Sequence, residues 1–189
     1  IIEDRKEGFL QGVLVAPVPR WTIAAGKILG GGAIAWLQAC IFLGLAIVSG
    51  SVVMSLGLLG GVLMMAVAGL ALTALGVFFA WPMESTQGFH AIMNLVLMPL
   101  WLLSGAFFPI PLPTTESPVG QWVMHWLMRC NPLSYTIAGL RTMMGVAAET
   151  PDFWSPGLAF SWLVTMLFLV VTVVAAWRIV LRPVRGELA

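Results

Sequence analysis

The feature that most constrains this chain is a set of four long apolar runs, at residues 28–48, 53–80, 91–108 and 158–180. Each is close to or longer than the roughly 20 helical residues that cross the hydrocarbon core of a membrane. The chain is 60% hydrophobic and only 9% charged, which is more apolar surface than a water-soluble domain of 189 residues can bury. We therefore expect an all-α membrane protein with four transmembrane helices.

The basic residues predict how these helices are oriented. Counted on alternate sides of the runs, seven lie on one side: Arg5, Lys6, Arg20, Lys27, Arg178, Arg182 and Arg185. Two lie on the other side, Arg129 and Arg141. Because positively charged loops stay in the cytoplasm, we expect residues 1–27, 81–88 and 178–189 to be cytoplasmic. The short hairpin at 49–51 and the long segment 109–157 are then outside. The formal net charge of +1 argues against a nucleic-acid partner.

Residues 2–16 are predicted to form a short amphipathic helix before the first span. Phe9, Leu10 and Leu14 share one face at helical spacing, and the charged residues gather near the start. Pro17 and Pro19 cannot continue a helix, because the proline ring clashes with the preceding turn and lacks a donor. Such a helix, held close to a span, can transmit a push from a soluble partner. The alternative is a juxtamembrane helix that only lies on the membrane surface.

The outer segment 109–157 is predicted to contain two short helices, at residues 119–129 and 133–146. Both are apolar but too short to span, and Asn131-Pro132 separates them. Trp122 and Trp126 lie one helical turn apart, a spacing that suits the headgroup level of a membrane. Interfacial anchoring and a re-entrant hairpin both fit this pattern.

The sequence offers no set of residues for catalysis, nucleotide binding or metal binding. Gly26-Lys27 resembles the end of a phosphate loop, but the glycine before it and the Ser or Thr after it are missing. His90 and His125 stand far apart, without acidic residues or cysteines at ligand spacing. We expect this chain to be no enzyme and to bind no cofactor itself.

Polar residues inside the spans are few. No acidic residue lies in the middle of a span, which argues against transport driven by protons or ions and favours energy supplied from outside the membrane. For Gln38 and Asn94, a hydrogen bond between helices and a position along a transport path are both open. Gly57-x3-Gly61 allows close helix packing. The candidate path-lining or helix-packing residues are Gln38, Asn94, Pro99 and Ser104.

Three motifs, in order, resemble a known family. EDRKEGFLQGVLVAPVPRWTIAAGK, at residues 3–27, resembles the cytoplasmic loop of ABC-2 type exporter permeases. NLVLMPLWLLSGAFFPIPLP, at residues 94–113, is similar to the fifth-span motif of that family. NPLSY at 131–135, followed by GLR at 139–141, resembles its outer motif before the last span. The sequences of these motifs most resemble the branch of the family that exports drugs, lipo-oligosaccharides and polysaccharides.

The resemblance implies a C-terminal part of a six-span subunit, with the first two spans absent. It implies that residues 2–16 are the coupling helix that docks on a cytosolic ATPase, which would bind ATP and Mg. The coupling residues it points to are Glu3, Asp4, Arg5, Glu7, Gly8, Leu10 and Leu14. The outer-motif residues are Asn131, Pro132, Tyr135 and Arg141. Further implied partners are a second permease subunit, as a homodimer, and membrane lipids, in a bacterial inner membrane.

The expected function is outward transport of an amphipathic, lipid-linked or glycan substrate by a permease that a partner ATPase drives. A membrane-embedded enzyme acting on lipid is the first alternative, and it would need clustered His, Asp or Glu near the bilayer. A structural membrane protein is the second, and it predicts no ATPase partner. Apolar path linings look alike for drugs, lipids and glycans, so these substrate classes stay open.

Overall fold

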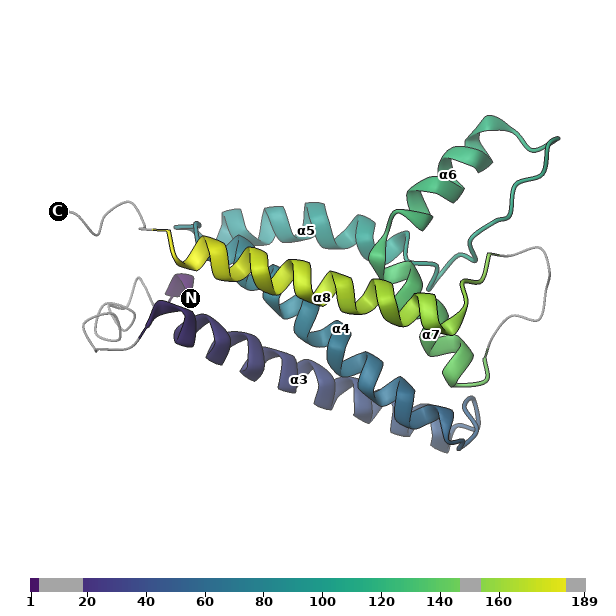
Figure 1. Ribbon diagram of the computed structural model, residues 1–189, viewed down its shortest axis with the longest axis horizontal. Helices are drawn as coiled ribbons and strands as arrows, with labels where there is room; N and C mark the ends of the chain where they lie inside the picture. The colour runs from purple at the N-terminus through teal and green to yellow at the C-terminus, as the bar shows by residue number, and fades with distance from the viewer. Residues whose placement is uncertain (4–18, 147–153, 183–189) are drawn as a thin grey trace.

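The computed structural model describes residues 1–3, 19–146 and 154–182 (Figure 1). Its helices are α3 (Arg20–Val48), α4 (Gly57–Ala80), α5 (Thr86–Leu102), α6 (Val119–Arg129), α7 (Pro132–Met143) and α8 (Leu158–Val180). The described part contains no β-strand. The prediction of an all-α membrane protein is confirmed.

Three of the helices, α3, α4 and α8, are long and apolar enough to cross a membrane by length and composition. The helix α3 begins at Arg20, eight residues before the expected span, because Pro19 provides the extended N-cap from which it starts. The helix α4 begins at Gly57 rather than 53, so the turn between these two spans is longer than the expected hairpin.

The third apolar run, at 91–108, differs most from the expectation. Its helix, α5, has 17 residues and ends at Leu102, so the prolines at 109, 111 and 113 do not terminate it. Instead, the Ser104 hydroxyl donates to the carbonyl of Trp101 at 2.6 Å, and Gly105 has a φ of +80°. Because glycine adopts positive φ at little cost, the chain leaves the helix there. At its other end, the Ser85 side chain caps α5 by accepting the amide of Gly88.

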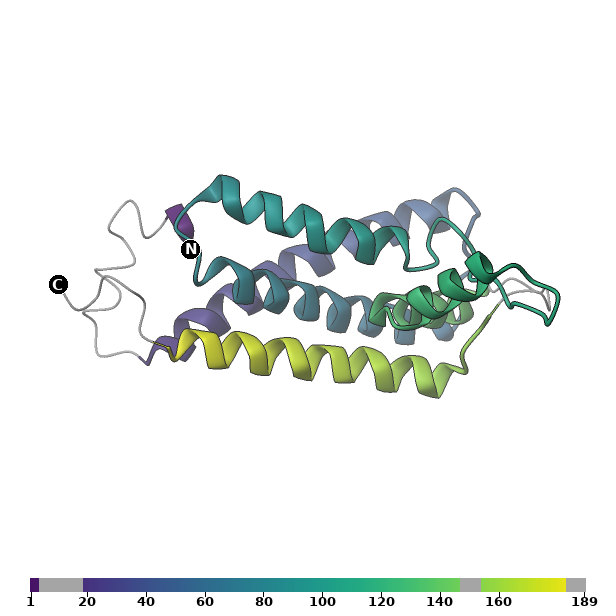
Figure 2. The same cartoon turned by 90° about the horizontal axis from the view of Figure 1, so that it is seen from above.

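The helix α4 lies at the centre of the bundle. It packs against α8 and α3, and α7 covers one end of the α4–α8 pair. Figure 2 shows α5 on one side of α4 and α8 on the other. The helix α5 makes only a small contact with α4, and none of its residues is buried. The core of the described chain is therefore formed by α3, α4, α7 and α8, with α5 at its margin.

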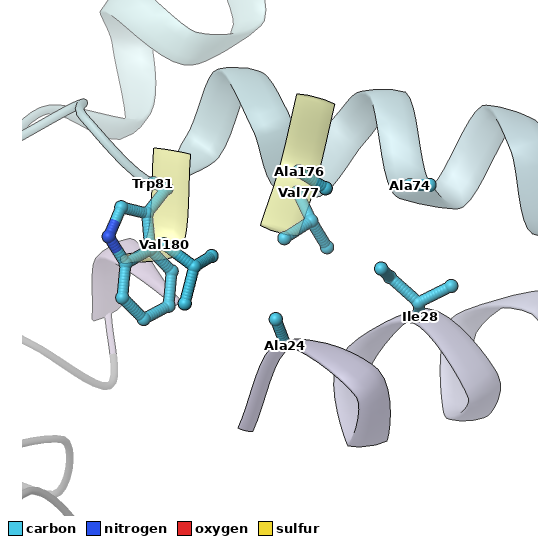
Figure 3. Packing of buried hydrophobic residues seen from close by; sticks show 7 residues of the cluster. All are labelled: Ala24, Ile28, Ala74, Val77, Trp81, Ala176 and Val180. Carbon is cyan, nitrogen blue, oxygen red and sulfur yellow. The ribbon is translucent and has the colours of Figure 1, made fainter. Parts of the chain in front are cut away.

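One cluster of buried side chains ties α3, α4 and α8 together near one end of the bundle (Figure 3). We call it the basal cluster; it consists of Ala24, Ile28, Ala74, Val77, Trp81, Ala176 and Val180. Each of the three helices contributes one alanine to it, Ala24, Ala74 and Ala176, and small residues allow helices to approach closely, as they commonly do inside a membrane. Ile1 is partly buried against this cluster.

The helix ends alternate between the two ends of the bundle. The start of α3, the turn between α4 and α5, and the end of α8 lie at the end that carries the described N-terminal residues (Figure 1). The α3–α4 turn, α6 and α7 lie at the opposite end. Arg20, Arg178 and Arg182 therefore share one end, and Arg129 and Arg141 lie at the other. This arrangement has the alternation that the basic residues predict, and the side that faces the cytoplasm stays a prediction.

Cysteine labelling tests which end of the bundle faces the cytoplasm. In a variant in which Cys40 and the exposed Cys130 are replaced by serine, we expect an impermeant thiol reagent to label Ser51→Cys and Glu116→Cys in intact cells. Glu84→Cys, in the turn between α4 and α5, should be labelled only after the membrane is permeabilised, because the basic residues keep that end inside. Labelling of Glu84→Cys in intact cells would contradict the orientation.

Candidate functional site

The predicted coupling segment enters the described structure only at its start. Glu3 is exposed, and Ile2 beside it is only 7% exposed. Since Ile1 packs against the basal cluster, the described beginning of this segment is anchored on the junction of α3, α4 and α8. The other predicted coupling residues lie outside the described residues: Asp4, Arg5, Glu7, Gly8, Leu10 and Leu14.

A pocket of about 520 Å³ opens next to this anchor, between the adjoining ends of α3, α4 and α5. Its lining residues include Glu3, Lys27 and His90. Thr73 and Thr86 also line it, and the remainder of the wall is mainly apolar. A pocket with both charges and apolar walls suits an amphipathic ligand. Sequence reasoning missed it because its residues come from four separate segments.

Two amide side chains lie near the middle of their helices and are exposed. Gln38 lies on α3 and Asn94 on α5, and neither amide forms a hydrogen bond with another helix in the described part of the chain. The interhelical hydrogen bond considered for them is therefore not made within these residues. An unpaired amide in hydrocarbon costs several kcal/mol, roughly 4–8 on the alkane-transfer scale. In a membrane, the Gln38 and Asn94 amides therefore each need a polar partner, such as water, substrate or another protein segment.

The end of α5 is held by a set of contacts that we call the carbonyl clamp. Beyond Leu102 the backbone leaves the helix, so the carbonyls of its last turn and of the residues that follow have few partners within the helix. Side chains of the α7 region supply donors instead. The Asn131 amide donates to the carbonyl of Leu100 at 2.6 Å, and the Arg141 guanidinium donates to that of Ala106 at 3.0 Å. The Ser134 hydroxyl lies within donating distance of two carbonyls, Met128 at 2.6 Å and Leu103 at 3.1 Å. Backbone carbonyls at and beyond the end of the helix are thereby given hydrogen-bond donors.

The outer-motif residues also shape α7 itself. Asn131 is its N-cap, because the side-chain oxygen accepts the amide of Leu133, and Pro132 follows in the first turn. Tyr135 is buried and makes edge-to-face contacts with Trp154 and Phe160. The four predicted residues are thus brought together around α7, where they join the end of α5 to the start of α8.

A tight contact holds α7 against α4 and α8. A Cβ on Gly57 would lie 2.5 Å from the carbonyl oxygen of Met143, and one on Gly139 would lie 2.8 Å from the sulfur of Met64. The hydroxyls of Thr136 and Thr165 are 3.0 Å apart and link α7 to α8. Among the described residues, the Ser161 hydroxyl is buried without a hydrogen-bond partner. Gly57 therefore allows the end of α7 to approach α4 closely, because the nearby atom is fixed backbone, whereas Gly139 faces the flexible end of Met64.

The helix α6 extends from the bundle and packs mainly against α7 (Figure 1). Its bounds, Val119–Arg129, are those the sequence predicted. Only His125 and Met128 are buried on it, while Trp122 and Trp126 are exposed. His125 hydrogen-bonds the carbonyl of Pro111 through Nδ1 at 2.6 Å, which fixes the loop that enters the helix. The choice between interfacial and re-entrant placement stays open.

Sequence reasoning identified most residues of the carbonyl clamp but not their partners. Asn131 and Arg141 were assigned to one motif, and Pro99 and Ser104 to another, without a link between the two. Ser134 was missed, although it stands three residues after Asn131 and therefore on the same face of α7. That spacing is the signal that could have found it. Ser104 is buried and caps the end of α5, which makes it a turn residue.

Comparison with known proteins gives one match. Residues 1–178 match a family model described as ABC-2 family transporter protein. The match covers the basal cluster apart from Val180, the carbonyl clamp and every predicted site residue. Neither curated proteins nor solved structures yield a match.

Proposed function

The chain belongs to the ABC-2 family of transporter proteins, and we propose that it moves an amphipathic, lipid-linked or glycan substrate outward, driven by a separate cytosolic ATPase. ATP and Mg would bind that partner. The chain is a multi-pass membrane component of a transporter rather than a catalytic subunit. The drug, lipo-oligosaccharide and polysaccharide branch and a bacterial inner membrane are the setting that fits its motifs best.

The anchoring of the coupling segment supports this proposal most directly. A partner can shift a permease between two states only by contacting the two states differently. Ile1 packs against the basal cluster, where α3, α4 and α8 meet, and Ile2 beside it is buried. A force applied to the residues that follow is therefore delivered to three helices at once. The charges from Glu3 to Glu7 would supply the docking surface for the ATPase.

The marginal position of α5 supports a transport path beside it. This helix has no buried residue and a small contact with α4, while the carbonyl clamp holds its outer end. In our proposal, α5 moves relative to the core, and Asn94 and Gln38 face the path or the second permease subunit. The pocket containing Glu3, Lys27 and His90 would be its cytoplasmic entrance. A homodimer would cover the exposed faces of α3 and α5.

A charge reversal at the docking surface tests the coupling. In the full-length protein with its ATPase, Glu3→Lys combined with Glu7→Lys is expected to reduce substrate-stimulated ATP hydrolysis roughly tenfold or more, the scale of a typical coupling free energy. Export should fall by a similar factor, because hydrolysis no longer drives the permease. The measurements are ATPase activity with and without substrate in proteoliposomes, and export in the same preparation.

The matched control is Glu84→Lys, which reverses an exposed acidic residue in the turn between α4 and α5. It should leave both activities near the unchanged protein, and membrane insertion of all variants is checked by fractionation. Unchanged stimulation in the double variant would refute the coupling role. A structural protein or a lipid-modifying enzyme would show no ATPase that its presence stimulates.

A further inference from the structure

We propose that the end of α8 binds an anionic phospholipid of the leaflet on that side of the membrane, with the phosphate held by Arg178 and Arg182. Arg178 lies in the last turn of α8 and Arg182 one turn further along the chain. Both are exposed, and neither guanidinium has an ion pair among the described residues. Two adjacent unneutralised cations at a membrane surface attract anionic headgroups.

An apolar groove leads from these arginines toward the middle of the membrane. It has a volume of about 550 Å³ and runs along α8 beside Phe78 of α4. Its walls are formed by residues one helical turn apart, so they make a continuous stripe: Val170, Val171, Val174, Ala175, Arg178, Ile179 and Arg182. The only charged groups that line it are the two arginines at one end.

The dimensions suit a lipid chain. At 1.5 Å per residue, the apolar stretch from Val170 to Arg178 is about 12 Å long, and Arg182 lies at about 18 Å. One leaflet contributes about 15 Å of hydrocarbon. A chain lying in the groove therefore places its phosphate level with the two guanidinium groups, whose planar forks match phosphate oxygens.

A second groove lies on the other side of α8 and receives the second chain. It has a volume of about 680 Å³ between α3 and α8, and it shares Val170 and Val174 with the first. Trp21 and Trp177 line it. Tryptophan favours the headgroup level of a membrane. The two chains of one lipid can thus lie on either side of a ridge on α8.

The charge balance at this end favours an anion. The C-terminal end of a helix, here that of α8, carries a partial negative charge of about half an elementary charge, which by itself repels phosphate. Two full positive charges at Arg178 and Arg182 outweigh it. Inorganic phosphate has no acyl chain to bury in the apolar groove, so the expected ligand is a phospholipid with an anionic headgroup.

Native mass spectrometry with phosphatidylglycerol and phosphatidylcholine tests the site. The full chain, purified in detergent, is titrated with each lipid, and the bound fraction gives the affinity. We expect phosphatidylglycerol to bind more tightly, and Arg178→Gln with Arg182→Gln to weaken it about thirtyfold, on the scale of one basic residue each. Arg129→Gln removes a cation from α6, at the opposite end of the bundle, and should leave the affinity near that of the unchanged protein.

A second pair of variants tests the groove without changing charge. Val171→Trp would fill the groove, while Leu163→Trp changes a side chain of similar exposure, 58% against 55%, elsewhere on α8. Only Val171→Trp should lower phosphatidylglycerol binding. Equal binding of both lipids, full displacement by inorganic phosphate, or unchanged binding in both the arginine and Val171 variants would overturn the proposal.

Discussion

Replacing Asn131 with leucine is expected to lower the unfolding midpoint of the protein in detergent by about 5–10 °C. The change removes the N-cap of α7 and leaves the carbonyl of Leu100 without its 2.6 Å donor. A lost cap costs about 1 kcal/mol, and a buried polar group left unpaired costs about 1–3 kcal/mol. For a chain of this size, a loss of that order corresponds to several degrees. Thermal unfolding followed by tryptophan fluorescence measures it.

Asn94→Leu is the matched control, because it makes the same chemical change at an exposed amide without a hydrogen bond in the described chain. Because the Asn94 amide has no hydrogen bond to lose, the unfolding midpoint of this variant in detergent should stay the same or rise rather than fall. Asn131→Ser retains a capping oxygen but cannot reach Leu100, so it should fall between the two. Equal midpoints for the two leucine variants would show that the carbonyl clamp does not stabilise the fold.

Adding one methyl group to Gly57 is expected to destabilise the protein by about 1–3 kcal/mol. The new Cβ would lie 2.5 Å from the carbonyl oxygen of Met143 and 3.3 Å from its carbon. These are backbone atoms at the end of α7, so relief requires moving one helix against another. The overpacking should exceed the gain of up to about 1 kcal/mol that alanine offers over glycine inside a helix. Gly57→Ala unfolding in detergent measures the balance.

Gly76→Ala provides the control within the same helix. A Cβ there would meet nothing within 4 Å, so only the helix propensity changes. The variant should be neutral or more stable by up to about 1 kcal/mol. Opposite signs for the two substitutions would show that close approach of α4 and α7, rather than helix propensity, sets the need for glycine at 57. A stabilised Gly57→Ala would contradict the packing.

The sequence alone determined the membrane class, the places of the apolar helices and the two short outer helices. These features follow from local physics. A run of apolar residues must be buried in lipid or protein, and proline cannot continue a helix. The bounds of α6 were predicted to the residue for the same reason, since Pro118 precedes it and Asn131-Pro132 follows it. The three motifs carried the family, which the match over residues 1–178 confirmed.

Only the tertiary structure decided how α5 ends and what the outer motif does. Leu102 ends α5 within an apolar run, and hydrophobicity continues across this boundary without a break. The partners of Asn131 and Arg141 are backbone carbonyls about thirty residues earlier in the chain, at Leu100 and Ala106. Every residue has a carbonyl, so no side-chain pattern marks which one accepts. Long-range contacts between a side chain and the backbone become visible only once the helices are packed, because packing brings them together.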